Sequence, residues 1–141
     1  MAKAATKERP TKTDADEPAL AVSGIDHVVL HVTDLARSRR FYTEVLGMTV
    51  KHDYPCHLFL GCGGQRVALF VTDDKDGFEA GRDLNHLALN VAGKSYEEIV
   101  AALRSRGIKV EGRTGDERCI YFEDPDGHQL QIVAGSVSTV R

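Results

Sequence analysis

Apolar and polar positions along the chain follow the same order twice. Residues 25–32 read IDHVVLHV and residues 84–91 read LNHLALNV, so the two stretches align position by position, with His27 matched to His86. Each stretch is mostly apolar and is interrupted by polar residues, a pattern that predicts a buried strand. Self-similarity of this kind predicts two copies of one supersecondary unit.

A helix is expected after each of these strands. In the first half Asp34 is a candidate N-cap, apolar positions then recur at helical spacing, and Gly47 ends the pattern. In the second half Ser95 and Glu98 form a capping-box pattern, and Gly107 follows the apolar stripe. The two halves therefore share one plan.

Three short runs rich in strand-forming residues follow each helix. These runs are 48–54, 58–60 and 66–71 in the first half, and 108–111, 118–123 and 129–134 in the second. Turn-forming residues at 61–64 and in the DPDG stretch at 124–127 separate the last two runs of each half. The order βαβββ, repeated, predicts an α+β fold.

The length of 141 residues and the 42% hydrophobic composition fit one compact domain. The start of the chain mixes acidic and basic residues and lacks the apolar stretch of a secretory signal, so we predict a disordered tail. The predicted organisation is an N-terminal tail at 1–22, one domain at 23–136 with a first βαβββ module at 23–72, a linker at 73–83 and a second module at 84–136, and a C-terminal tail at 137–141.

The charge pattern narrows the choice of partner. The net charge is −3, and Lys and Arg are scattered, which argues against binding to nucleic acid or to an acidic membrane surface. No apolar run approaches the roughly 20 residues of a membrane span, so a small-molecule substrate is the expected partner. Cys56, Cys62 and Cys119 form no CxxC pair, which favours free, inert thiols packed in a cytoplasmic protein.

Three stretches, taken in order and spacing, resemble the vicinal-oxygen-chelate superfamily. They are IDHVVLHV with the following DLARSRRFYTEVLGM, then LNHLALNV, then YFEDPDGHQLQIV. This group holds glyoxalase I, extradiol dioxygenases, fosfomycin-resistance proteins and bleomycin-binding proteins, and the resemblance covers roughly Gly24 to Gly135. It implies two βαβββ modules that form a curled eight-stranded mixed sheet around a cavity, often in a homodimer.

The matched histidines are the leading candidates for metal ligands. Alternate side chains of a strand share a face, so His27 lies with His31, and His86 lies with Ala88 and Asn90. A pseudo-twofold relation between the modules would bring His27 and His86 together. Neutral imidazole suits Fe, Mn, Zn or Ni, and two histidines with one carboxylate leave positions open for substrate.

The third ligand that the resemblance implies departs from the family pattern. The family takes it from the last strand, in a segment like DPDGHxLE, where this chain has Gln131. An amide oxygen can coordinate a metal, but it is neutral and weaker than a carboxylate. We predict a divalent metal ion of unknown identity, held by His27, His86 and Gln131.

No single activity of the superfamily is matched in full. The stretch 67–71, where glyoxalase I has a glutamate ligand, is entirely apolar. The extradiol dioxygenase signature fits at Tyr121 and the following turn, but Thr114 stands near the place of a histidine, and Gln131 replaces the glutamate. Fosfomycin-resistance transferases share DPDGH but also use a glutamate. Lyase, dioxygenase and thiol-transferase activities therefore stay open.

Four further residues are candidates for catalysis or substrate binding. His31 is placed to contact an anion or shuttle a proton, and Tyr121 to donate to an oxyanion. Arg113 and Asn90 are candidate substrate contacts, Arg113 through its forked donors to a carboxylate or phosphate. The alternatives are a surface histidine, a packing tyrosine and a solvated arginine. His128 is expected to be solvated and structural.

Two functions of different classes follow from these residues. The first is a metal-dependent enzyme acting on a small oxygen-bearing molecule, with the ion as a Lewis acid. The second is a metal-free binding protein of the bleomycin-sequestering type, which Gln131 and the apolar stretch Ala68-Leu69 motivate. A pure protein-interaction module has little support, because no exposed amphipathic helix or charged stripe stands out.

Overall fold

The computed structural model describes residues 18–19, 21, 24–73, 78–82, 84–113 and 116–134. Of residues 113 and 116–118 it describes the backbone alone. The predicted tails lie almost wholly outside the described residues. In the part of the chain that is described, no helix is long and apolar enough to cross a membrane.

The predicted βαβββ order is present in both halves. The first half holds β1 (His27–Val32), α1 (Leu35–Arg40), the π-helix η2 (Phe41–Val45), β2 (Thr49–Asp53), β3 (His57–Cys62) and β4 (Gln65–Val71). The second half holds β5 (Leu87–Val91), α2 (Tyr96–Ser105), β6 (Glu111–Arg113), β7 (Asp116–Glu123) and β8 (Gln129–Ala134). The repeat read from the sequence is therefore confirmed.

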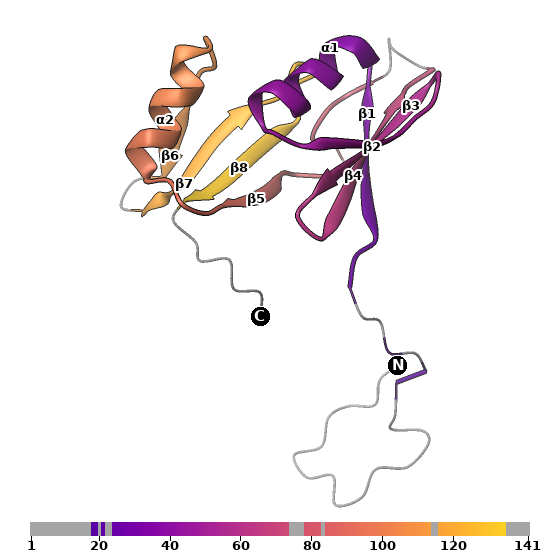
Figure 1. The fold of residues 1–141 in the computed structure, drawn as a ribbon, viewed down its shortest axis with the longest axis horizontal. Coiled ribbons are helices and arrows are strands. Elements are labelled where there is room, and N and C mark those ends of the chain that lie inside the picture. The colour runs from indigo at the N-terminus through magenta and orange to yellow at the C-terminus, as the bar shows by residue number, and fades with distance from the viewer. Residues whose placement is uncertain are drawn as a thin grey trace, which may run out of the picture.

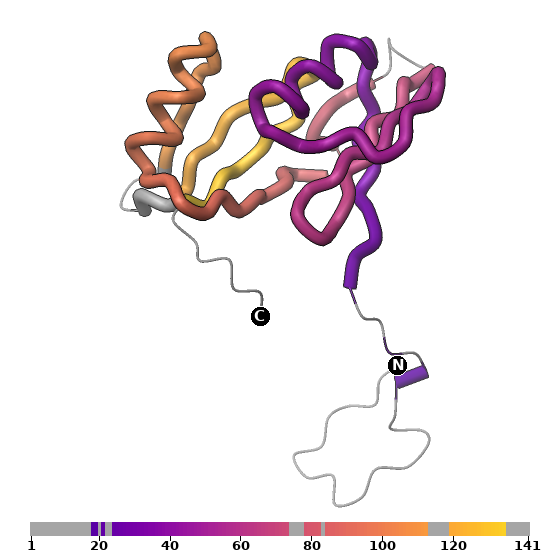
Figure 2. Tube along the Cα trace, viewed as in Figure 1, coloured from indigo at the N-terminus to yellow at the C-terminus, as the bar shows by residue number. Residues whose placement is uncertain are grey.

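The strands form two four-stranded sheets of identical topology. Their orders are β1-β4-β3-β2 and β5-β8-β7-β6, and in each sheet only the pair β1·β4 or β5·β8 is parallel. The α+β fold class is confirmed, although within the described residues the strands are hydrogen-bonded as two sheets rather than as one curled sheet of eight. Figures 1 and 2 show the first half, indigo to magenta, lying beside the orange and yellow second half.

The first helix begins as predicted and changes its winding. The carboxylate of Asp34 accepts a hydrogen bond from the backbone amide of Arg37 at 3.1 Å, which makes it the N-cap. The hydroxyl of Thr43 donates to the carbonyl of Arg39 at 2.8 Å, and such a bond competes with the backbone ladder. The α-helix gives way here to the wider η2, and Gly47 ends it with φ of 72°.

The second helix has the predicted capping box. The hydroxyl of Ser95 accepts from the amide of Glu98 at 3.1 Å, and the carboxylate of Glu98 accepts from the amide of Ser95 at 2.8 Å. These bonds to Ser95 lower the pKa of the Glu98 carboxyl. The buried stripe includes Val100, whereas Ala102, which the sequence placed in the stripe, is exposed.

The DPDG turn between β7 and β8 joins the two modules. The carboxylate of Asp126 accepts hydrogen bonds from Thr33, from the guanidinium of Arg37 at 3.0 Å and from the hydroxyl of Ser38 at 3.3 Å. Only 3% of its side-chain surface is exposed. A residue of the second module therefore accepts hydrogen bonds from three residues at the start of the first helix, which ties the two modules together.

Asp124, in the same turn, adds a buried contact between the two modules. Its carboxylate accepts from the hydroxyl of Tyr42 at 2.8 Å and from the amides of Asp126 and His128 at 2.9 Å. Burial, with the charge of Asp124 close by, raises the pKa of the Tyr42 phenol, which stays a neutral donor. Sequence reasoning treated the turn only as a link between strands, because its partners are remote along the chain.

His128 is not solvated, contrary to the sequence-based expectation. It is 8% exposed, because the docked turn is covered by the first module. Its ring stands edge-on to Phe78 at 5.6 Å between centroids, and its Nε2 donates to the backbone carbonyl of His31 at 2.7 Å. Its predicted structural role fits these contacts, which tie β1 to the second module.

Candidate metal centre

The two matched histidines have the same local partner in each module. Nδ1 of His27 lies 2.8 Å from a carboxylate oxygen of Asp26, and Nδ1 of His86 lies 2.8 Å from the amide oxygen of Asn85. Because these oxygens can only accept, each Nδ1 donates to them, and in the neutral ring Nε2 keeps its lone pair. Metal-ligating histidines in proteins are held in this way by an acceptor on the other ring nitrogen.

The contact with His27 also affects the pKa of the Asp26 carboxyl. The hydrogen bond from His27 lowers the pKa of Asp26, which therefore remains an anion at neutral pH. A carboxylate behind the imidazole makes the ring a more basic ligand. Asn85 gives the same orientation to His86 without adding charge.

His86, Tyr121 and Gln131 lie on one face of the second sheet. Gln131 is paired with Ala88 of β5 and with Tyr121 of β7, and paired side chains share a face. The rings of His86 and Tyr121 meet edge-on, with centroids 6.0 Å apart. Three of the residues that the sequence predicted for the site are thus brought together.

Gln131 is the most enclosed of the predicted ligands. It is 8% exposed, and its amide nitrogen donates to the sulfur of Cys119 at 3.2 Å. Cys119 is itself 7% exposed, two residues before Tyr121 in β7. An amide buried with its nitrogen engaged in this way has its oxygen as the remaining polar end.

His27 lies on an aromatic face of the first sheet. Its ring meets Phe59 edge-on at 5.2 Å between centroids. On the same face Tyr54, His57 and Phe70 form a stack with centroid separations of 4.5 and 4.6 Å. The spacing of His57 in the sequence is only a weak reason to place it near a cavity, because the register of β2, β3 and β4 is what assembles these rings.

Both histidine faces are open to solvent in the single chain. Ile25, 66% exposed, and Val29, 42% exposed, flank His27, and Leu84, 38% exposed, precedes His86. Within the described residues, no three His, Cys, Asp or Glu side chains form a group that could hold a metal ion. The predicted donors are thus distributed over two faces, one in each module, with His27 and His86 exposed and Gln131 buried.

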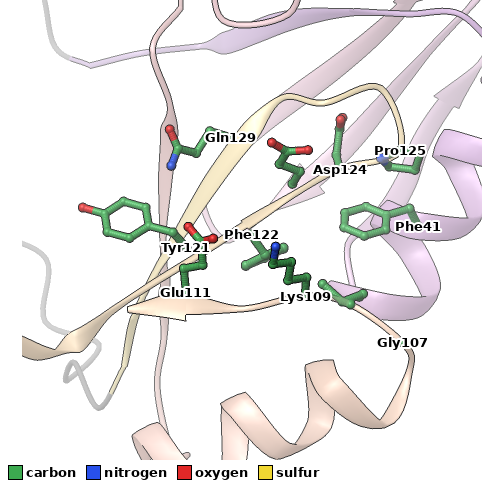
Figure 3. A pocket seen from close by; sticks show the side chains of 11 residues that line it. Phe41, Gly107, Lys109, Glu111, Tyr121, Phe122, Asp124, Pro125 and Gln129 are labelled. Carbon is green, nitrogen blue, oxygen red and sulfur yellow. The ribbon is translucent and has the colours of Figure 1, made fainter. Parts of the chain in front are cut away.

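A cavity of about 510 Å³ adjoins the second of these faces (Figure 3). Tyr121 lines it, and opposite Tyr121 in the sheet register is Glu111 of β6, followed along the wall by Lys109. Glu123 and Gln129, which are also paired, line it nearer the DPDG turn. Alternation along β6 and β7 would have identified the two glutamates, but the sequence reasoning placed β6 at 108–111 and missed them.

The other predicted site residues are more dispersed. His31 is exposed on β1 and lines a cavity of about 420 Å³ together with His128 and Arg82. Asn90 is exposed on β5 and lines a cavity of about 500 Å³. The side chain of Arg113 lies outside the described part of the chain, so its substrate contact stays a prediction.

Known proteins are similar to this chain over most of its length. The family model described as Glyoxalase/Bleomycin resistance protein/Dioxygenase superfamily matches residues 24–132. Glutathione transferase FosA of Serratia marcescens is 29% identical over 119 residues, covering 83% of this chain and 84% of that protein. Metallothiol transferase FosB of Staphylococcus saprophyticus is 31% identical over 122 residues, covering 82% of this chain and 80% of that protein.

A solved structure agrees with these sequence matches. The integron cassette protein HFX_CASS4, from the mobile metagenome of the Halifax Harbour sewage outfall, superposes with a TM-score of 0.66 at 30% identity. The superposition covers 80% of this chain and 99% of that one.

Proposed function

Since the chain belongs to the glyoxalase/bleomycin resistance protein/dioxygenase superfamily, we propose that it is a divalent-metal-dependent enzyme acting on a small oxygen-bearing molecule in the cytoplasm. The observation that carries the proposal is the repeated histidine arrangement. In both modules an oxygen of the preceding side chain holds Nδ1 and leaves Nε2 for a metal ion.

The donor set fits a borderline divalent ion. Two neutral imidazoles from His27 and His86, with the amide oxygen of Gln131, suit Fe, Mn, Zn or Ni better than Ca²⁺, which prefers six to eight oxygens. Three protein ligands leave coordination positions for substrate. Bound there, the ion would act as a Lewis acid on a substrate oxygen.

We place the complete site in a homodimer. The apolar side chains beside His27 and His86 are exposed in one chain, and burial of such surface drives association. In a twofold dimer the same surface is used on both chains, so His27 of one subunit can face His86 and Gln131 of the other. Closure of the site within one chain is the alternative.

Mixing two inactive variants distinguishes these arrangements. His27→Ala and His86→Ala each remove one ligand from every site, so each dimer alone should hold no stoichiometric metal. If sites span two chains, a randomly reassorted equal mixture should regain about a quarter of the wild-type metal, because half the dimers are mixed and each carries one intact site. No recovery after verified subunit exchange would show that each site lies within one chain.

Thiol transfer is the reaction that the relatives favour. Curated relatives at 29% and 31% identity are a glutathione transferase and a metallothiol transferase. The cavity of about 510 Å³ has room for a small molecule beside Tyr121. The phenol of Tyr121, next to His86, would donate to the substrate oxygen as its charge increases. His31 and Asn90 line two other cavities, so they would contact only a substrate that extends beyond the cavity at Tyr121.

A metal-free binding protein is the second candidate, because Gln131 contributes no charge to a cation site. Gln131→Glu should separate the two functions. In a metal site the added carboxylate should lower the Kd for Mn²⁺ roughly 10- to 100-fold, since an anion replaces a neutral ligand. Calorimetric titration of the purified protein measures this change.

The matched control for that substitution is Gln129→Glu. Gln129 lies two residues earlier in β8, on the same face, and is exposed. It adds the same charge without entering the proposed ligand set, so the Kd should change less than about threefold in a screened, exposed position. Absence of Mn²⁺ binding by the wild type, with no gain in Gln131→Glu beyond that in Gln129→Glu, would support the metal-free binding protein.

A further inference from the structure

Each predicted ligand has a neighbour that holds it in one orientation. Asp26 holds His27, Asn85 holds His86, and the sulfur of Cys119 accepts the amide nitrogen of Gln131 at 3.2 Å. We propose that Cys119 is a positioning residue, which turns the amide of Gln131 so that its oxygen faces the metal ion. The inference rests on the proposed function and deepens it by one residue.

A glutamine needs such a partner more than a glutamate does. Both oxygens of a carboxylate can bind a cation, whereas an amide has one oxygen and one NH₂ group whose hydrogens repel a cation. The two amide orientations have nearly the same shape, so packing alone discriminates poorly between them. An acceptor beside the nitrogen selects the orientation in which the oxygen is left for the ion.

The sheet register fixes the relation between Cys119 and Gln131. In the antiparallel pair of β7 and β8, Tyr121 is opposite Gln131 and Cys119 is opposite Val133, so Cys119 is the diagonal neighbour of Gln131 on the same face. Both side chains are more than nine-tenths buried. Water therefore competes little for the amide nitrogen, and a weak acceptor such as sulfur is sufficient.

Metal binding and this hydrogen bond should strengthen each other. Coordination through the amide oxygen withdraws electron density from the nitrogen, which makes its N–H group a better donor to Cys119. By linkage, loss of the sulfur acceptor then weakens metal binding by the same free energy by which metal binding strengthens the hydrogen bond. The other two cysteines lack this relation, since Cys56 is exposed and Cys62 lies half-buried in β3 of the first module.

A double-mutant cycle tests the proposal by the Kd for Mn²⁺, measured by calorimetric titration. Cys119→Ala should raise the Kd about 10-fold, which is the low end of the effect of removing such a partner. Cys119→Ser keeps an acceptor and should stay within about threefold of wild type. In the Gln131→Glu background, Cys119→Ala should have no effect beyond about threefold, because a carboxylate has no N–H group to hold.

The pattern of the cycle decides between positioning and packing. If Cys119→Ala raises the Kd equally in the wild-type and Gln131→Glu backgrounds, or leaves the wild-type Kd unchanged, the positioning role of Cys119 is overturned. The proposed function would still stand in these cases, provided that the wild type binds Mn²⁺. Wild-type protein that binds no Mn²⁺ would overturn both. Cys62→Ala is the control for loss of a thiol and should bind Mn²⁺ as wild type does.

A second readout needs no metal. The side-chain amide protons of Gln131, assigned by their loss in Gln131→Glu, should shift in the nitrogen–proton NMR spectrum of Cys119→Ala and shift less in Cys119→Ser. Resonances that are the same in all three proteins would contradict the hydrogen bond on which the proposal stands.

Discussion

Replacing either matched histidine by alanine should abolish stoichiometric metal binding. Four-ligand structural zinc sites bind with about 10–16 kcal/mol in total, so removing one imidazole from a three-ligand site should weaken binding roughly 100-fold or more. His27→Ala and His86→Ala should lose metal binding to the same extent, because their imidazoles have equivalent roles in the repeat. Elemental analysis of protein purified without chelator measures the metal content.

His52→Ala is the matched control for His27→Ala. The ring of His52 also meets Phe59 edge-on, at 6.2 Å, on the same face of the first sheet. It tests whether loss of any imidazole from this face affects metal content through the aromatic cluster. Wild-type metal content in His27→Ala, or the same loss in His52→Ala, would contradict the assignment of His27 as a ligand.

Asp126→Ala should cost about 2–3 kcal/mol of unfolding free energy. Removal of this carboxylate leaves donors of Thr33, Ser38 and Arg37 without their acceptor in a part-buried junction. A broken buried ion pair costs about 3–5 kcal/mol, and partial exposure of the Arg37 side chain, at 42%, lowers the expected value. Urea unfolding followed by circular dichroism measures the difference.

An exposed aspartate of the first module provides the comparison. Asp53 forms an ion pair with Arg39 at 2.6 Å, but the two side chains are 51% and 44% exposed. Asp53→Ala should therefore cost less than about 1 kcal/mol. A cost for Asp126→Ala no greater than that for Asp53→Ala would show that the DPDG turn does not hold the modules together.

The local plan of the fold could be predicted from the sequence because its signals are local. Asp34 caps the first helix, Ser95 and Glu98 form the capping box, and Gly107, with φ of 78°, follows the second helix. Each depends on residues within a few positions of one another. The change from α1 to η2 was not predicted, because the competing bond of Thr43 has no distinctive sequence pattern.

Contacts between the modules could not be predicted in the same way. Asp126 and Thr33 are 93 positions apart, and only the docked modules show that they meet. The burial of His128 also results from the contact between the two modules, so it could not be predicted from nearby residues. The eight strands were expected in one curled sheet, but β1 and β5 each pair within their own module.

The candidate site was predicted in part. The repeat identified His27 and His86, and the register places Tyr121 beside Gln131. The oxygens that hold the histidines precede them directly in the sequence, as Asp26 and Asn85, and this signal was available. Cys119 was interpreted as an inert packing residue, because nothing in its spacing indicates its contact with Gln131.

The proposed site requires that one imidazole from each module binds the same ion. Anomalous diffraction from crystals of the Mn²⁺-loaded protein tests it most directly. We expect one peak per site about 2.0–2.3 Å from Nε2 of a His27 and Nε2 of a His86, with the amide oxygen of Gln131 also in the coordination sphere. A peak elsewhere, or the two rings too far apart to share an ion in the assembled protein, would contradict it.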